Sequence, residues 1–141
     1  MWFNNRSKIA PVELAGSIVR ICLPKFSTSE WHPFSAFYDP YDVRYACVYI
    51  HNAGDWTNLL HEYARWNKHL PHAWIAGPLF SEFQACMSYR NILCVCSGTA
   101  IAPIMGLAQY WEPGEHTVTV IWLLRDKNLI AQMLPAMNPA T

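Results

Sequence analysis

Charge is what this sequence has little of. Only 14% of its 141 residues are charged, and its ten basic side chains are balanced by ten acidic ones. A protein that binds nucleic acid releases counterions from phosphates with clustered Lys and Arg, and no such cluster is present. The composition therefore argues against a nucleic-acid partner, and it offers no polybasic segment for an anionic membrane surface.

Long apolar runs are also lacking. The longest β-like stretch, "TVTVIWLL" (117–124), falls far short of the ~20 residues that a membrane helix needs. The first residues contain no apolar segment of a secretory signal. Five cysteines, an odd number without secretory context, indicate reduced thiols inside a cell. We expect a cytoplasmic chain, or one at the cytosolic face of a membrane if it is part of a longer protein.

Apolar and aromatic side chains are abundant. They make up 52% and 14% of the chain, which is enough for one hydrophobic core at this length. Composition alone favours a core with a hydrophobic docking face over a ring-stacking site for a planar cofactor. Both interpretations remain open at this point.

The first half of the chain has an antiparallel character. Two β-branched, apolar segments at 16–23 and 43–51 are bounded by turn residues and predict strands. Thr57 is the predicted N-cap of an amphipathic helix that follows, and Pro71 stops its pattern.

The second half alternates strands and helices. A short helix is predicted at 81–88, and helices begin at Pro103 and near Asp126. The intervening runs at 91–96 and 116–124 are nearly all apolar, as expected for strands buried on both faces. This order indicates a parallel α/β unit.

One short motif, "EWHPFS", sets several chemical groups side by side. Pro33 has a fixed φ and biases His32 toward an extended backbone. Phe34 can lie against a planar ring, and Ser35 can form a hydrogen bond at the edge of that ring. The imidazole of His32 can donate to a phosphate oxygen. Packing of a buried Pro-Phe pair would explain the same residues without a ligand.

A second motif, "AGDWT" (53–57), has the chemistry of an anion site. A glycine turn and a threonine stand at a helix start, where free N–H groups and the helix dipole favour negative charge. An ordinary helix cap is the alternative explanation. A planar ring joined to a phosphate chain is a dinucleotide, so the two motifs together indicate a nucleotide cofactor.

Taken together, "EWHPFS" and "GDWT" resemble the flavin-binding motifs of the ferric reductase and NADPH oxidase dehydrogenase domain, in the ferredoxin–NADP reductase superfamily. The segments "AGSIVRICLP", "AGPLF", "CSGTAIAP" and "IWLLRD" are similar to further motifs of that family and occur in the same order. The resemblance covers roughly residues 14–134.

The resemblance implies an α+β fold in two parts. An incomplete antiparallel β-barrel of the FAD-binding type with a capping helix would occupy 14–78. A partial parallel α/β nucleotide-binding unit would occupy 79–134, with tails at 1–13 and 135–141. The early barrel strands and the late Cys-Gly motif of the family have no counterpart here, so we expect a copy truncated at both ends. Open strand edges would then invite self-association.

The resemblance also implies an FAD-dependent oxidoreductase that passes reducing equivalents from NAD(P)H through flavin to an acceptor, in relatives a haem-bearing membrane portion. Ser35 would be the catalytic residue, near the flavin N5, and His51 would replace the arginine that usually faces the pyrophosphate. The residues assigned to cofactor binding are His32, Pro33, Phe34, Ser35, His51, Gly54, Thr57, Gly98, Thr99 and Pro103.

The nucleotide turn departs from the family pattern. In "CSGTAIAP" only Gly98 remains, because Cys96 and Ala100 stand where glycine is usual, and Phe80 replaces a glycine in "GPLF". A side chain at such a place costs about 1 kcal/mol or more if φ must be positive. We therefore expect FAD to bind and NADPH or NADH to bind weakly or not at all. The alternative function is a non-catalytic remnant or interaction module of the same fold.

No metal site and no hydrolytic site is predicted. Cys94 and Cys96 alternate along one strand and are interpreted as small hydrophobes that face the same side. The three histidines of residues 61–72 have no clear acidic or cysteine partner for zinc. The sequence has neither a Gly-x-Ser-x-Gly elbow nor a Walker lysine.

Overall fold

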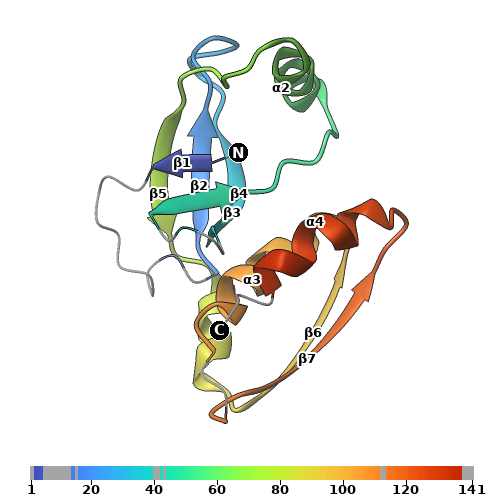
Figure 1. Ribbon diagram of the computed structural model, residues 1–141. Coiled ribbons are helices and arrows are strands. Elements are labelled where there is room, and N and C mark those ends of the chain that lie inside the picture. Colours follow the sequence, from blue (N-terminus) through green and yellow to red (C-terminus); the bar gives the residue numbers. More distant parts are fainter. Residues whose placement is uncertain are drawn as a thin grey trace.

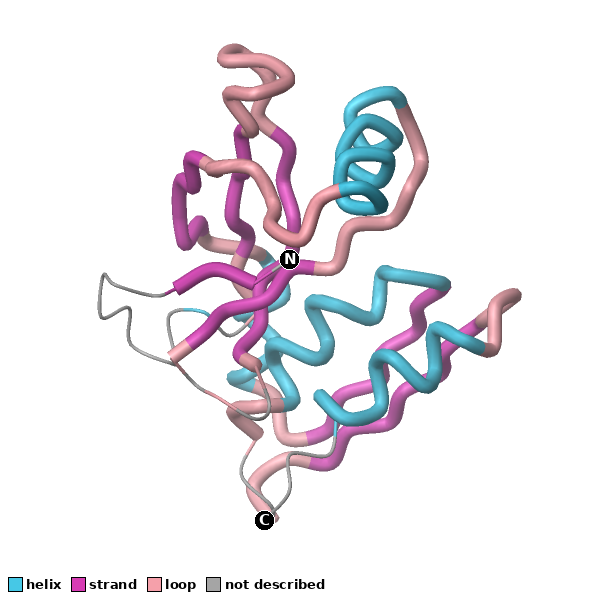
Figure 2. Tube along the Cα trace, turned by 45° about the horizontal axis from the view of Figure 1, so that its top comes forward, coloured by secondary structure: helices cyan, strands magenta, loops and turns pink. Residues whose placement is uncertain are grey.

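Two β-sheets organise the chain. The computed structural model describes residues 2–4, 14, 16–39, 42, 44–111 and 114–137. Figure 1 shows the larger sheet with helix α2 beside it, and the smaller sheet with helices α3 and α4 beside it. Figure 2 shows the same two groups of strands from another direction.

The larger sheet has five strands in the order β1-β4-β3-β2-β5, and every neighbouring pair is antiparallel. In the described part of the chain β1 and β5 form its edges, so the sheet does not close into a barrel. The strands are β1 (Trp2–Asn4), β2 (Ile18–Cys22), β3 (His32–Tyr38), β4 (Tyr45–Val48) and β5 (Trp74–Leu79). The predicted antiparallel character of the first half is confirmed.

Strands β2 and β4 lie within the predicted segments, whereas β3 and β5 were not predicted as strands. Both of the latter contain proline, which lacks the N–H that a central strand donates to its neighbour. In β3, Pro33 is exposed and lies opposite Arg20 of β2. β3 lies between two strands only over Ala36–Tyr38, which pair with β4; at Pro33 its one described neighbour is β2, so no β4 residue needs the missing N–H.

Helix α2 (Asp55–Trp66) begins earlier than predicted. Its N-cap is Gly54, with an extended backbone (φ −168°), so the prediction that Thr57 is the N-cap was wrong. Thr57 lies inside the first turn and its hydroxyl accepts hydrogen bonds from the backbone N–H groups of Ala53 and Gly54, at 2.9 Å each. Its side chain therefore stabilises the helix start from within, as the third residue of a capping box does.

The smaller sheet consists of two parallel strands with helices around them. β6 (Asn91–Ser97) pairs in parallel with β7 (Thr117–Leu123), and Val95 lies opposite Ile121. The predicted parallel arrangement is confirmed. The helical elements of this half are η1 (Glu82–Ser88), η2 (Gly98–Ile101), α3 (Ala102–Ala108) and α4 (Asn128–Met137).

The prediction that β6 and β7 are buried on both faces was wrong. On the face toward α3 and α4 the residues Cys94, Cys96, Val120 and Trp122 pack against the core. The alternate side chains point away from that core and are 48–64% exposed: Leu93, Val95, Ile121 and Leu123. We call these four the uncovered sheet face. A strand that is apolar on both sides needs cover on both sides, and the described residues supply it on one.

Helix α3 joins the two sheets. A Cβ built on Gly106 would lie 2.9 Å from the carbonyl oxygen of Ala36 in β3, so the helix backbone rests directly on that strand. One turn later, the Gln109 amide accepts from the backbone N–H of Tyr38 at 2.8 Å and donates to its C=O at 2.7 Å. The side chain of Gln109 thus pairs with the end of β3 as a neighbouring strand would.

Candidate functional site

The four residues of the His-Pro-Phe-Ser motif lie on two faces of β3. Side chains alternate along a strand, so His32 and Phe34 share one face while Pro33 and Ser35 share the other. Phe34 packs against the core that contains Trp56, whereas Phe37, on the face of Ser35, belongs to the core beneath α3. Ser35 is half-buried and lies opposite Ile18 of β2.

Trp56 connects this strand to the start of helix α2. Its ring lies 4.4 Å from that of His32 and 6.0 Å from that of Phe34, measured between ring centroids. The interplanar angles are 33° and 29°, so both contacts are close to stacked. Because Trp56 directly precedes Thr57, the two sequence motifs come together in the fold. Sequence reasoning did not select Trp56, although it lies within the Gly-Asp-Trp-Thr motif.

Two ring nitrogens in this stack lack hydrogen-bond partners. Nε2 of His32 and Nε1 of Trp56 are both buried, and neither has a partner among the described residues. The Glu30 carboxylate is 3.8 Å from Nε2 of His32, which is too long for a hydrogen bond. Most buried polar atoms in folded proteins have a partner, so two orphans on adjacent rings call for an explanation.

The start of helix α2 presents backbone donors. Its N-cap Gly54 offers no side chain to the N–H groups of the first turn, and a Cβ built there would meet nothing within 4 Å. The hydroxyl of Thr57 is committed to the backbone, since it accepts from Ala53 and Gly54 and donates to the C=O of Gly54 at 2.8 Å. An anion at this end would meet backbone N–H groups first. His51 is exposed in the segment before the helix.

The predicted nucleotide turn forms regular structure. Gly98 opens η2 with a left-handed φ of +54°, and its C=O accepts a hydrogen bond from Nε1 of Trp122 at 2.8 Å. Thr99 follows in η2, and Pro103 is the second residue of α3. Cys96 lies within strand β6 and Ala100 is the third residue of η2, after the left-handed Gly98; strands and 3₁₀-helices have negative φ, which side chains tolerate.

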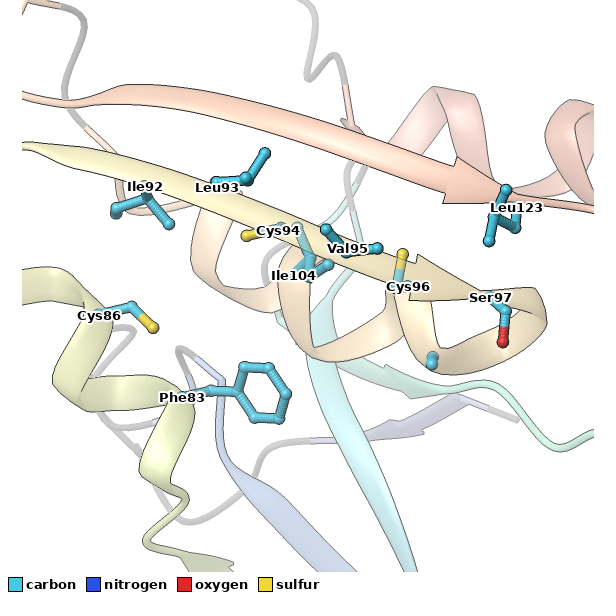
Figure 3. A pocket seen from close by; sticks show the side chains of 11 residues that line it. Phe83, Cys86, Ile92, Leu93, Cys94, Val95, Cys96, Ser97, Ile104 and Leu123 are labelled. Atoms are coloured by element: carbon cyan, nitrogen blue, oxygen red, sulfur yellow. The ribbon is translucent and has the colours of Figure 1, made fainter.

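A cavity of about 560 Å³ lies between η1 and β6. Figure 3 shows Phe83 and Cys86 of η1 on one side and residues of β6 on the other. Ser97 and Ala100 line it, whereas Gly98, Thr99 and Pro103 are absent from its described lining, so it lies beside the predicted turn. Burial raises the pKa of the Cys94 and Cys96 thiols, which line it as well, so both stay protonated at neutral pH.

No three side chains of His, Cys, Asp or Glu in the part of the chain that the structure describes are placed to hold a metal ion. None of the helices described above combines the length and the apolar character that crossing a bilayer requires.

Comparison with known proteins identifies relatives in sequence, although no family model matches the chain. NADPH oxidase 3 of Homo sapiens is 29% identical over 135 residues, which is 84% of this chain and 23% of that protein. NADPH oxidase 1 of Rattus norvegicus is 27% identical over 133 residues, again 23% of its own length. The chain thus spans less than a quarter of the relatives that it matches.

Solved structures show a similar fold. An intact type IV self-sufficient cytochrome P450 monooxygenase matches 97% of this chain with a TM-score of 0.63 at 14% identity, over 18% of its own length. A siderophore-interacting protein from Acinetobacter baumannii matches 82% of the chain with a TM-score of 0.51 at 13% identity, over 47% of its own length.

These findings place the chain in a structural class. An antiparallel sheet followed by a parallel pair of strands with helices fits a partial ferredoxin–NADP reductase-like fold. In sequence the chain is similar to the NADPH oxidases, and the resemblance predicted from its motifs is confirmed.

Proposed function

We propose that this chain is a flavin-binding part of an NAD(P)H-dependent oxidoreductase of the ferric reductase and NADPH oxidase type. The observation that carries the proposal is the contact of His32 and Phe34 with Trp56, which brings both motifs to one place. Sequence similarity to NADPH oxidases supports the same conclusion.

The residues at this place fit FAD. The two buried ring nitrogens of His32 and Trp56 can donate to oxygen atoms of the cofactor, and the first turn of α2 can receive a phosphate. Phe34 offers an aromatic face to a planar ring, and Trp56 supports it from behind. His51 provides one further N–H group without permanent charge when the imidazole is neutral.

The protein would supply orientation, and bound FAD would supply hydride and single-electron chemistry. His32 and Phe34 hold the cofactor at the strand, and the helix start holds its phosphates. Ser35 faces the other side of β3 from His32 and Phe34, so the flavin ring would lie past the strand edge at 32–35, which β4 leaves unpaired, with the Ser35 hydroxyl directed to the reactive nitrogen. We propose that nicotinamide nucleotide binds weakly, because Gly98 is the one glycine left in the turn and Ala100 lines the adjacent cavity.

Partners and location follow from the same proposal. The acceptor would be a haem-bearing, membrane-embedded portion, and the chain would lie at the cytosolic face of that membrane. The low charge of the sequence fits an electron acceptor in the same protein better than a separate charged protein that diffuses to this chain and is attracted by charge.

Flavin binding by the purified chain is the direct test. We expect the chain to turn yellow with added FAD and to retain the absorbance through gel filtration. The double variant His32→Ala/Ser35→Ala should bind FAD at least 10-fold more weakly, because it loses groups at the phosphate side and at the ring edge, each worth about 1 kcal/mol. Equilibrium titration followed by flavin absorbance measures both affinities.

The control is His61→Ala, which removes an exposed imidazole on the outer part of α2 and should leave FAD affinity unchanged. A folded, colourless wild-type chain that ignores added FAD would contradict the proposal. In the same cuvette, NADPH added without oxygen should bleach the bound flavin slowly or not at all. Rapid bleaching would show that the altered turn still accepts the nucleotide.

A second candidate function is an interaction module without catalysis, favoured by the uncovered sheet face. Apolar residues 48–64% exposed on neighbouring strands form a surface that another protein surface can cover. We propose that the isolated chain self-associates through this face and the open edge of β6. Sedimentation velocity should show a sedimentation coefficient that rises with concentration.

The double variant Val95→Thr/Ile121→Thr tests this association. Threonine keeps the β-branched shape that suits a strand but makes the face more polar, so the variant should sediment as a monomer at all concentrations. Leu59→Thr is the matched control, because Leu59 is 54% exposed on α2, away from this sheet. Equal association of all three proteins would exclude the face as the cause.

A further inference from the structure

The contact between α2 and β3 assigns a role to a residue that neither motif singles out. We propose that Trp56 is a positioning residue of the flavin site: its indole fixes the rings of His32 and Phe34 and sets the place of the helix start. This inference rests on the proposed flavin-binding function and deepens it.

The burial of α2 shows why Trp56 controls the helix start. Of the helix's described residues only Trp56 and Leu60 are buried, one in the first turn and one in the second. Trp56 is 5% exposed and belongs to the same core as β2, β3 and β4. The far end of the helix is held separately, by an edge-to-face contact between Phe26 and Tyr63. Removing the indole would therefore release the end that carries the open N–H groups.

The two ring contacts show why Trp56 also controls β3. Both His32 and Phe34 lie on the face of the strand toward α2, and the indole covers a ring of each. An imidazole at the first residue of a strand has freedom to rotate, and a neighbouring ring plane limits it. Trp56 thus couples the orientation of His32 and Phe34 in the His-Pro-Phe-Ser motif to the position of the helix.

The indole contributes a hydrogen-bond donor as well. Nε1 of Trp56 can only donate, and it is buried with no partner in the described structure. It shares this state with Nε2 of His32 on the neighbouring ring, whose centroid is 4.4 Å away. We expect an acceptor oxygen of the flavin nucleotide to pair with these nitrogens, which requires that the two rings move enough on binding to bring them out of their present burial.

Three variants separate these contributions in FAD titrations of the full chain. Trp56→Leu removes both the stack and the donor, and should weaken FAD binding by about 10-fold or more, the loss expected for two aromatic contacts. Trp56→Phe keeps a ring but lacks the N–H, so its affinity should lie between those of Trp56→Leu and wild type. Trp66→Leu is the matched control, since Trp66 ends the same helix and is 80% exposed; it should bind as wild type does.

A cofactor-free readout distinguishes positioning from general stability. In NMR spectra of the imidazole Cε1–H groups, His32 should be shifted upfield by the indole ring current. The shift should remain in part in Trp56→Phe and disappear in Trp56→Leu, with the five other histidines unchanged. If Trp56→Leu does not fold, the test compares wild type with Trp56→Phe alone. The thermal unfolding midpoints of these two proteins are measured as well, so that a change in FAD affinity or in the His32 shift is not due to lower stability.

The outcomes separate this inference from the function on which it rests. If wild type binds FAD and Trp56→Leu, or in its place Trp56→Phe, binds it equally well, Trp56 has no positioning role while the flavin function stands. If wild type binds no FAD, the proposed function fails and this inference fails with it. A graded loss in the order wild type, Trp56→Phe, Trp56→Leu, together with the loss of the His32 shift, supports both.

Discussion

An alanine at Gly106 should destabilise the folded chain by about 1–3 kcal/mol, although alanine is the better helix former. Gly106 lies within α3, where helix propensity alone predicts a gain of up to ~1 kcal/mol. The added Cβ would lie 2.9 Å from the carbonyl oxygen of Ala36 and 3.1 Å from the backbone nitrogen of Gly16. Both are backbone atoms, which cannot swing aside as a side chain can.

Urea unfolding followed by circular dichroism measures the effect. We expect a lower midpoint with an unchanged slope, which indicates a change in stability without a change in the exposed surface. Gly54→Ala is the control, because its Cβ would meet nothing within 4 Å and its backbone is extended, so it should lose only the N-cap preference for glycine over alanine, about 0.5–1 kcal/mol. A Gly106→Ala midpoint at or above that of wild type would show that α3 does not rest on β3 as described.

The substitution Gln109→Leu should lower the free energy of unfolding by about 2–4 kcal/mol, because it removes two hydrogen bonds from partly buried backbone groups, each worth about 1–3 kcal/mol. The lost bonds are those to the N–H and the C=O of Tyr38, at 2.8 Å and 2.7 Å. Leucine has a similar volume, so packing changes little. The bonds also tie α3 to the end of β3, so the loss should loosen the contact between the two sheets.

Asn67→Leu is the matched control for Gln109→Leu. Asn67 also uses its side-chain amide on the backbone, donating to the C=O of Tyr63 at 2.7 Å, but it is exposed. Water can replace that bond, so the variant should lose no more than ~0.5 kcal/mol. Hydrogen exchange would localise the effect: in Gln109→Leu the amide of Tyr38 should exchange faster, whereas equal exchange in both variants would contradict the assigned role.

Local sequence patterns predicted those strands whose composition is typical of a strand. The β-branched run at 18–22 is a strand, and the runs at 91–97 and 117–123 form the parallel pair. Strands β3 and β5 escaped prediction because Pro33 and Pro78 contradict the usual composition of a strand. Both strands form because they pair with β2, β3 on one side of it and β5 on the other, and this pairing outweighs the unfavourable composition.

The candidate site was predictable in its parts but not in its geometry. The spacing of residues within 32–35 and 53–57 identified two motifs, and the fold brings them together. The indole of Trp56 between them is a contact across more than 20 positions, which no local pattern encodes. The N-cap at Gly54 was missed because a threonine at a helix start is a typical N-cap, and the local pattern does not show that its hydroxyl reaches back to the N–H of Gly54.

The pairing of β2 with β3 has a consequence for how this chain can vary in length. Ile21 lies opposite His32 and Val19 opposite Phe34. One residue inserted within β3 would exchange the two faces of the strand, directing Pro33 and Ser35 toward the helix and the imidazole away from it. The connection over 23–31 precedes this register and can lengthen or shorten without reversing it. Insertions and deletions among related sequences should therefore collect in that connection and spare the strand.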